Sequence, residues 1–115
     1  MSNLNLTTLK DSQCTVITVA GDLDLTSCPA LEDAACRAMD DGSSLRLDMS
    51  GVTFMDSSGL NLLLILRGRL MDGGGRLELT GVREAPMRVL TMTGADALLL
   101  PAGAGARRQV LDPTT

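Results

Sequence analysis

The chain has 115 residues, of which 44% are hydrophobic and 21% are charged, and its formal net charge is −4. This length fits one domain with a single core, and the composition is that of a globular protein. Because nucleic-acid binding needs clustered Lys and Arg, the acidic balance argues against a nucleic-acid partner. We expect one domain over residues 1–115, with a core at 4–100 and a C-terminal tail or short helix at 101–115.

Membrane, metal and secretory functions are also disfavoured by the sequence. The longest apolar run, residues 62–66, is far shorter than the roughly 20 residues that cross a bilayer. The N-terminus lacks the regions of a signal peptide. The three cysteines are isolated and histidine is absent, so no metal-ligand pattern is present. We therefore expect a cytoplasmic protein that has no cofactor, no metal site and no membrane partner.

The N-terminal segment predicts a β-hairpin. Residues 4–9 alternate loosely between apolar and polar, and residues 14–20 alternate well and are rich in β-branched side chains. Two such segments joined by a short polar turn, which begins at Lys10, form antiparallel strands. Residues 21–25 contain Gly and two Asp residues, and we expect them to carry the chain out of the sheet.

A helix and a further strand are predicted next. Thr26 or Ser27 can cap the helix, and Pro29 suits its first turn. The apolar helical spacing continues to about Asp40, where an Asp-Asp-Gly sequence ends it. Residues 45–49 then read Leu-Arg-Leu-Asp-Met, an alternation that predicts a strand.

The middle of the chain contains its most apolar segment. Residues 50–56 are expected to form a loop that carries Val52 and Phe54 into the core. A helix is predicted from Ser57 to about Met71. Because it is apolar on nearly every side, it is either buried or presents a surface for a partner. A run of glycines then ends it.

The last predicted elements are a strand over residues 76–80, a helix that Pro86 opens and Gly94 ends, and a short strand over residues 98–100. Strands and helices alternate along the chain. This predicts an α/β fold: a mixed, mostly parallel sheet with an N-terminal hairpin, packed against about three to four helices. In such sheets functional groups gather where a strand ends and a helix begins, and Ser57 falls at such a junction.

The sequence offers little for catalysis. A nucleophilic serine needs a base, and without histidine the usual triad cannot be built. The single lysine, Lys10, lies in a predicted turn, and the segment around Ser57 lacks the G-x-S-x-G pattern of hydrolases. The glycine-rich residues 72–76 lead from a helix into a strand, whereas a phosphate-binding P-loop does the reverse. We predict no catalytic residue and no enzymatic activity.

Asp56, Ser57, Ser58 and Gly59 form the most informative motif of the chain. One interpretation is structural, with Asp56 or Ser57 capping the following helix through its side-chain oxygen. The other is a modification site, since a helix N-terminus favours negative charge and we expect the hydroxyl there to be exposed. The second hydroxyl, the uncovered backbone at Gly59 and the apolar helix that follows favour a phosphorylatable switch.

Three segments resemble the bacterial anti-sigma factor antagonists, a family with the STAS domain fold. Residues 54–60 read Phe-Met-Asp-Ser-Ser-Gly-Leu and closely resemble the family signature. Residues 21–24, Gly-Asp-Leu-Asp, resemble its Gly-Glu-Leu-Asp segment, and residues 85–94 resemble its proline-led third helix. The order of the predicted elements also matches, so the resemblance covers roughly residues 4–100.

The resemblance implies a partner-switching protein. In that family the unphosphorylated antagonist binds an anti-sigma factor with serine kinase activity, and this binding frees the sigma factor. The kinase phosphorylates the serine directly after the motif's aspartate, here Ser57, the antagonist lets go, and a PP2C-type phosphatase restores it. The residues expected to bind the partner are Asp22, Asp24, Asp56, Ser57, Ser58, Gly59 and Asn61.

Other uses of the same domain stay open at this point. A STAS module can also serve as a non-catalytic signalling scaffold or as an accessory subunit of a lipid transporter. Asp22 stands where the family has glutamate more often, and Asn61 and Leu62 replace small residues, which leaves the identity of the partner open. The apolar helix also leaves a weak homodimer open.

Overall fold

A computed structural model describes residues 4–10, 14–39 and 44–100. The predicted helix end at residues 40–42 and the predicted tail from Pro101 lie outside the described residues. The elements, in chain order, are β1 (Leu4–Lys10), β2 (Cys14–Leu23), α1 (Cys28–Met39), β3 (Ser44–Met55), α2 (Ser57–Asp72), β4 (Leu77–Thr80), α3 (Glu84–Thr93) and α4 (Asp96–Leu99).

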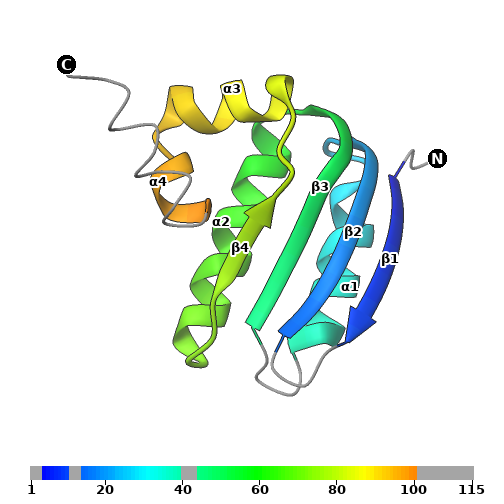
Figure 1. Cartoon of the computed structure of the whole chain (residues 1–115), viewed down its shortest axis with the longest axis vertical. Coiled ribbons are helices and arrows are strands. Elements are labelled where there is room, and N and C mark those ends of the chain that lie inside the picture. Colours follow the sequence, from blue (N-terminus) through cyan, green and yellow to red (C-terminus); the bar gives the residue numbers. More distant parts are fainter. Residues whose placement is uncertain (1–3, 11–13, 40–43, 101–115) are drawn as a thin grey trace.

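The four strands form one sheet in the order β1-β2-β3-β4 (Figure 1). β1 pairs with β2 in the antiparallel sense, which confirms the N-terminal hairpin, and the β2–β3 and β3–β4 pairs are parallel. Because parallel neighbours need a crossover, α1 joins β2 to β3 and α2 joins β3 to β4. The predicted α/β fold with a mixed, mostly parallel sheet is confirmed.

The helices cover one face of the sheet. α1 and α2 lie on the same side of the strands, α3 lies above α2 and contacts β3, and α4 lies beside α2 and β4 (Figure 1). Strand residues facing this layer are buried and alternate with more exposed ones, as a one-sided core requires. The largest fully buried side chains are Ile17, Val19, Leu23, Leu31, Leu45, Leu47, Met49, Leu63, Leu66, Leu79, Leu90 and Leu99.

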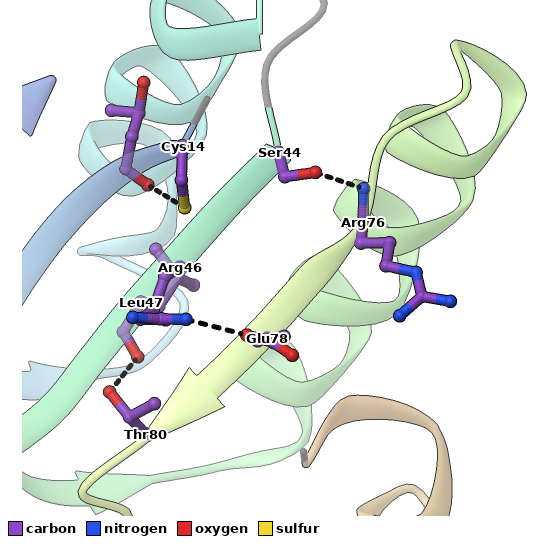
Figure 2. Close-up of polar contacts among 8 residues, drawn as sticks. Cys14, Ser44, Arg46, Leu47, Arg76, Glu78 and Thr80 are labelled. Atoms are coloured by element: carbon purple, nitrogen blue, oxygen red, sulfur yellow. Dashed lines mark hydrogen bonds and ion pairs between the residues drawn. The ribbon is translucent and has the colours of Figure 1, made fainter. Parts of the chain in front are cut away.

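The opposite face of the sheet carries polar side chains. Arg46 on β3 forms an ion pair of 3.2 Å with Glu78, its register neighbour on β4. Figure 2 shows this pair in front of the strands, with the helices behind, together with the Arg76 amide, which donates to the Ser44 hydroxyl at 3.2 Å. This pairing is typical of a strand face that contacts water rather than a second layer.

β2 and β3 extend further than predicted. Residues 21–23 continue β2, and residues 50–55, predicted as a loop, continue β3. The two extensions pair with each other after two register shifts, and Leu23 lies opposite Met55. At the other strand ends the differences are small: Lys10 closes β1 instead of opening the turn, and β4 begins at Leu77.

Phe54 does not enter the core, and that prediction is wrong. Val52 is fully buried as expected, but Phe54 is 47% exposed. Leu23 and Met55 are a register pair and both are buried under the helices. The residues before them, Asp22 and Phe54, are also a register pair. Because successive side chains along a strand point to opposite faces, Phe54 points to the face that has no helices.

The C-terminal elements differ from prediction in two places. α3 begins at Glu84, two residues before Pro86, and ends as predicted at Gly94, whose φ of 80° suits glycine. Residues 98–100, predicted as a strand, instead belong to α4 and its C-cap. The amide of Leu99 donates to the Ala95 carbonyl at 3.0 Å, which is the bond of a helical turn.

Candidate functional site

Asp56 lies between β3 and α2 and caps the helix. Its Oδ1 accepts hydrogen bonds from the amides of Ser58 at 2.9 Å and Gly59 at 3.2 Å. The Leu60 amide donates to the Asp56 carbonyl at 3.1 Å. The amides of Ser58, Gly59 and Leu60, which would otherwise attract an anion, are therefore already engaged by the chain itself. Of the two capping residues that the sequence left open, the structure has Asp56.

Ser57 is the first residue of α2, and its side chain is exposed. Within the part of the chain that the structure describes, no hydrogen bond engages its hydroxyl, because Asp56 makes the capping bonds. Asn61 and Ile65 follow at intervals of four residues and are also exposed. The three side chains therefore lie along one face of α2. Ser58, the second hydroxyl, is half-buried.

Gly59 places the first turn of α2 against the ends of β2 and β3. A Cβ at this position would lie 2.9 Å from the carbonyl oxygen of Leu23 and 2.9 Å from a side-chain carbon of Met55. The Asp56 amide also donates to the Leu23 carbonyl, at 3.3 Å. Gly59 is buried, so within the described fold its contribution is close packing and not surface contact.

Asp24 and Ser27 hold the loop that follows β2. Asp24 Oδ1 accepts hydrogen bonds from the Thr26 hydroxyl at 2.8 Å and from the amides of Thr26 and Ser27, both at 3.1 Å. The buried Ser27 hydroxyl donates to the Asp22 carbonyl at 2.8 Å and accepts from the Asp24 amide at 2.9 Å. The hydroxyls of Thr26 and Ser27 thus bond within the loop, and neither makes a described bond to an amide of α1, although one of them was predicted to cap that helix. Asp24 is instead the residue that accepts bonds from successive amides.

The same contacts set the charge of the loop. The hydrogen bond from the Thr26 hydroxyl, followed by those from Ser27, holds the pKa of Asp24 below its ordinary value. Burial raises the pKa of the Cys28 thiol, and the negative charges of Asp56, Asp24 and Glu32 raise it further. Asp24 is therefore ionised at neutral pH, while Cys28 stays protonated and is a poor nucleophile.

The residues predicted to bind a partner gather at one end of the sheet, where β2 and β3 end side by side (Figure 1). The charges of Asp24 and Asp56 both act on Cys28, which also places the loop after β2 beside the start of α2. We call the exposed and half-buried members the Ser57 surface: Asp22, Asp24, Asp56, Ser57, Ser58 and Asn61. Gly59 lies beneath this surface.

Two apolar residues next to the Ser57 surface were missed by the sequence reasoning. Phe54 is 47% exposed and is the register neighbour of Asp22, and Leu25 is 72% exposed in the loop after β2. The position of Phe54 within the 54–60 motif was the available signal. Because an aromatic side chain is by default expected in the core, the exposure of Phe54 was not predicted.

The described residues show a cavity away from this end of the sheet, no metal-ligand cluster and no membrane-spanning helix. A cavity of about 400 Å³ lies at the other end of α2, near β4 and α4, and its charged lining residues are Arg67, Arg76 and Glu78. Among the described residues, no three His, Cys, Asp or Glu side chains gather as metal ligands. None of the described helices has the length and apolar character needed to cross a bilayer.

Comparison with known proteins gives a family and a fold. The family model described as "Mlab, STAS domain" matches residues 6–101. A search of curated proteins finds no match. An anti-sigma factor antagonist from Mycobacterium paratuberculosis has 28% identity, a TM-score of 0.75 and 95% coverage of both chains.

Two further structures extend the comparison of the fold. The anti-sigma factor antagonist SpoIIAA in its unphosphorylated form has 20% identity and a TM-score of 0.64, with 95% of this chain and 98% of that chain covered. The murine Solute Carrier 26 family member A9 anion transporter has 20% identity and a TM-score of 0.68, with 88% of this chain but 19% of the transporter covered. The resemblance seen in the sequence is confirmed, and the chain belongs to the STAS domain family.

Proposed function

We propose that the protein is an anti-sigma factor antagonist that is switched by phosphorylation of Ser57. In its unphosphorylated form it binds an anti-sigma factor with serine kinase activity and thereby frees a sigma factor. The kinase transfers a phosphoryl group to Ser57, and the modified protein is released until a PP2C-type phosphatase restores it. The protein acts in the cytoplasm and performs no catalysis of its own.

The observation that carries this proposal is the division of roles between Asp56 and Ser57. Asp56 makes the capping bonds of α2, so the Ser57 hydroxyl is exposed and has no structural bond among the described residues. A serine that merely capped the helix would be expected to bond the amides that Asp56 already holds. A hydroxyl left outside the cap is open to a kinase.

Phosphorylation at this position changes the surface more than the fold. It adds about −1.5 to −2 charges next to the carboxylates of Asp56 and Asp24. Because Asp56 holds the amides of Ser58 and Gly59, the phosphate cannot take those donors without displacing it. The added charge therefore projects outward, where a docked partner would have to desolvate it.

Intact mass after incubation with ATP and each purified anti-sigma kinase of the host tests the proposal. We expect a gain of one phosphate in the wild type and in Ser58→Ala, the adjacent-hydroxyl control, and none in Ser57→Ala. Ser57→Ala should also hold the kinase in the presence of ATP, and Ser57→Asp should bind it weakly. Phosphorylation that persists in Ser57→Ala, or no phosphorylation by any kinase, would contradict the switch.

A second candidate is an accessory STAS module of a lipid transporter or a signalling scaffold. The description of the matching family model and the similarity to part of an anion transporter favour it. This candidate predicts a stable complex with transporter subunits that survives purification and does not change when Ser57 is replaced by Asp. The two candidates are separated by whether binding responds to Ser57.

A further inference from the structure

Phe54 and Leu25 are exposed apolar side chains in the two segments that build the Ser57 surface. Phe54 is the sole aromatic residue of the chain, lies three positions before Ser57 and is paired in register with Asp22. The core lies on the other face of the sheet, so the exposed ring of Phe54 does not add to core packing in the described fold. Interfaces concentrate their binding energy in buried aromatic anchors, and an exposed one beside a docking surface is a candidate anchor.

The charged residues of these two segments are all acidic. Residues 22–27 and 54–61 contain three Asp residues and no Lys or Arg. Asp22 is the register neighbour of Phe54, and Asp24 is held in its ionised form by Thr26. A surface of this kind is complementary to a partner that presents Lys or Arg around an apolar pocket.

We propose, on the basis of the function proposed above, that Phe54 is the apolar anchor of partner binding. It inserts into an apolar pocket of the anti-sigma kinase, Leu25 extends the apolar contact, and basic side chains at the pocket rim face Asp22 and Asp24. The partner surface is thus apolar at its centre and positively charged at its edge.

This chemistry specifies how phosphorylation releases the partner. A basic rim does not repel a phosphate, so like-charge repulsion cannot cause release. Phe54 excludes water from the centre of the contact, and a phosphate on Ser57 would lose its hydration there. Asp56 already holds the amides of Ser58 and Gly59, so these two donors cannot replace the lost water without displacing Asp56. Release therefore follows from desolvation of a poorly partnered anion.

The test measures equilibrium affinity for the kinase that phosphorylates the wild type. Phe54→Ala should weaken binding by about 30-fold or more, as expected for a buried anchor. Phe54→Leu, which keeps an apolar side chain, should recover much of the loss. Leu9→Ala is the matched control, since Leu9 is 68% exposed on a strand at the opposite end of the sheet. A Phe54→Ala variant that is folded by circular dichroism and binds like the wild type overturns the proposal.

Two further measurements test the partner chemistry. The association rate of the wild type should fall as salt is raised, and Asp22→Asn should weaken that dependence; a rate that rises with salt contradicts a basic rim. Ser57→Gln and Ser57→Glu have the same shape and differ in charge. Both should weaken binding, because both place a polar group in a dry contact, whereas wild-type affinity in Ser57→Gln would mean release by charge repulsion and would overturn the inference.

Failure of this inference is distinguishable from failure of the switch. If phosphorylated wild type is released but Phe54→Ala binds normally, the switch stands and the anchor is wrong. If Phe54→Ala loses binding while phosphorylation has no effect, the anchor stands and the switch is wrong.

Discussion

Asp56 ties the local structure of α2 to the chemistry proposed for Ser57. Its carboxylate holds the amides of Ser58 and Gly59, so the helix depends on residue 56 and leaves residue 57 free for modification. In the proposed switch, Asp56 therefore contributes to stability and Ser57 to regulation. Replacing each in turn should give different phenotypes.

Asp56→Ala should lower the free energy of unfolding by about 1 kcal/mol, because the capping bonds are lost. Asp56→Asn keeps an acceptor oxygen and should lose less. Ser57→Ala, the matched control, should stay within about 0.5 kcal/mol of the wild type. Urea denaturation followed by circular dichroism measures all three. An equal loss in Ser57→Ala would identify the hydroxyl as the cap and remove the main support for the switch.

The hydrogen bond from the Thr26 hydroxyl should make the contribution of Asp24 to stability depend on pH. Its folded pKa is lowered, so its contribution to stability is present above the unfolded value of about 3.9 and is lost as the pH falls through the folded value. Thr26→Val should raise the Asp24 pKa toward its ordinary value, as measured by NMR titration of the carboxyl carbon. The pKa of Asp48 is lowered by the Ser50 amide and should not move in this variant. An unchanged Asp24 pKa would show that the Thr26 hydroxyl is not the cause.

At the scale of the elements, the position of α2 is set by how closely its first turn approaches the ends of β2 and β3. The absence of a side chain at Gly59 permits this approach, whereas a Cβ added at Gly68 on the same helix would have no neighbouring atom within 4 Å. The helix thus contains one glycine that packing requires and one that it does not.

Gly59→Ala should destabilise the fold by about 1–3 kcal/mol, because the new methyl group meets the Leu23 backbone and forces α2 outward. Gly68→Ala should instead stabilise it by about 0.5–1 kcal/mol through helix propensity. Thermal denaturation of both variants compares them directly. Because the displaced helix carries Ser57, phosphorylation of Gly59→Ala should also be slower. Equal stability of the two variants would contradict the close approach.

The elements also mark where sequence reasoning fails. Alternation identified the central parts of β2 to β4, which each have one buried face, and of β1, where Leu4 and Leu6 are half-buried. It missed the extensions of β2 and β3, because Gly21 and Gly51 are poor strand formers and pairing with neighbouring strands keeps them in the sheet. Residues 98–100 were mistaken for a strand because a short run of leucines suits a helix equally well.

For the whole molecule, the order of elements predicted a mixed, mostly parallel sheet packed against helices, with one strand too many at residues 98–100. Crossover connections leave few arrangements for such an order. The site was less predictable. The motif at residues 54–60 predicts Ser57 as the modification site, and parallel strands that end together explain why Asp22 and Asp24 lie at the same end of the sheet. The exposure of Phe54 depends on which face lacks helices, and this is decided by the packing of all elements together.

The bonds made by Asp56 bear on how long a signal lasts. A phosphoryl group anchored in the first turn of a helix would be shielded from water and from a hydrolase. Here Asp56 already holds the amides of Ser58 and Gly59, so these two donors would not anchor a phosphoester on Ser57. Its lifetime would then be set by how often a phosphatase arrives and not by any opening of the protein. The phosphorylated fraction of the protein would then depend only on the relative activities of the kinase and the phosphatase.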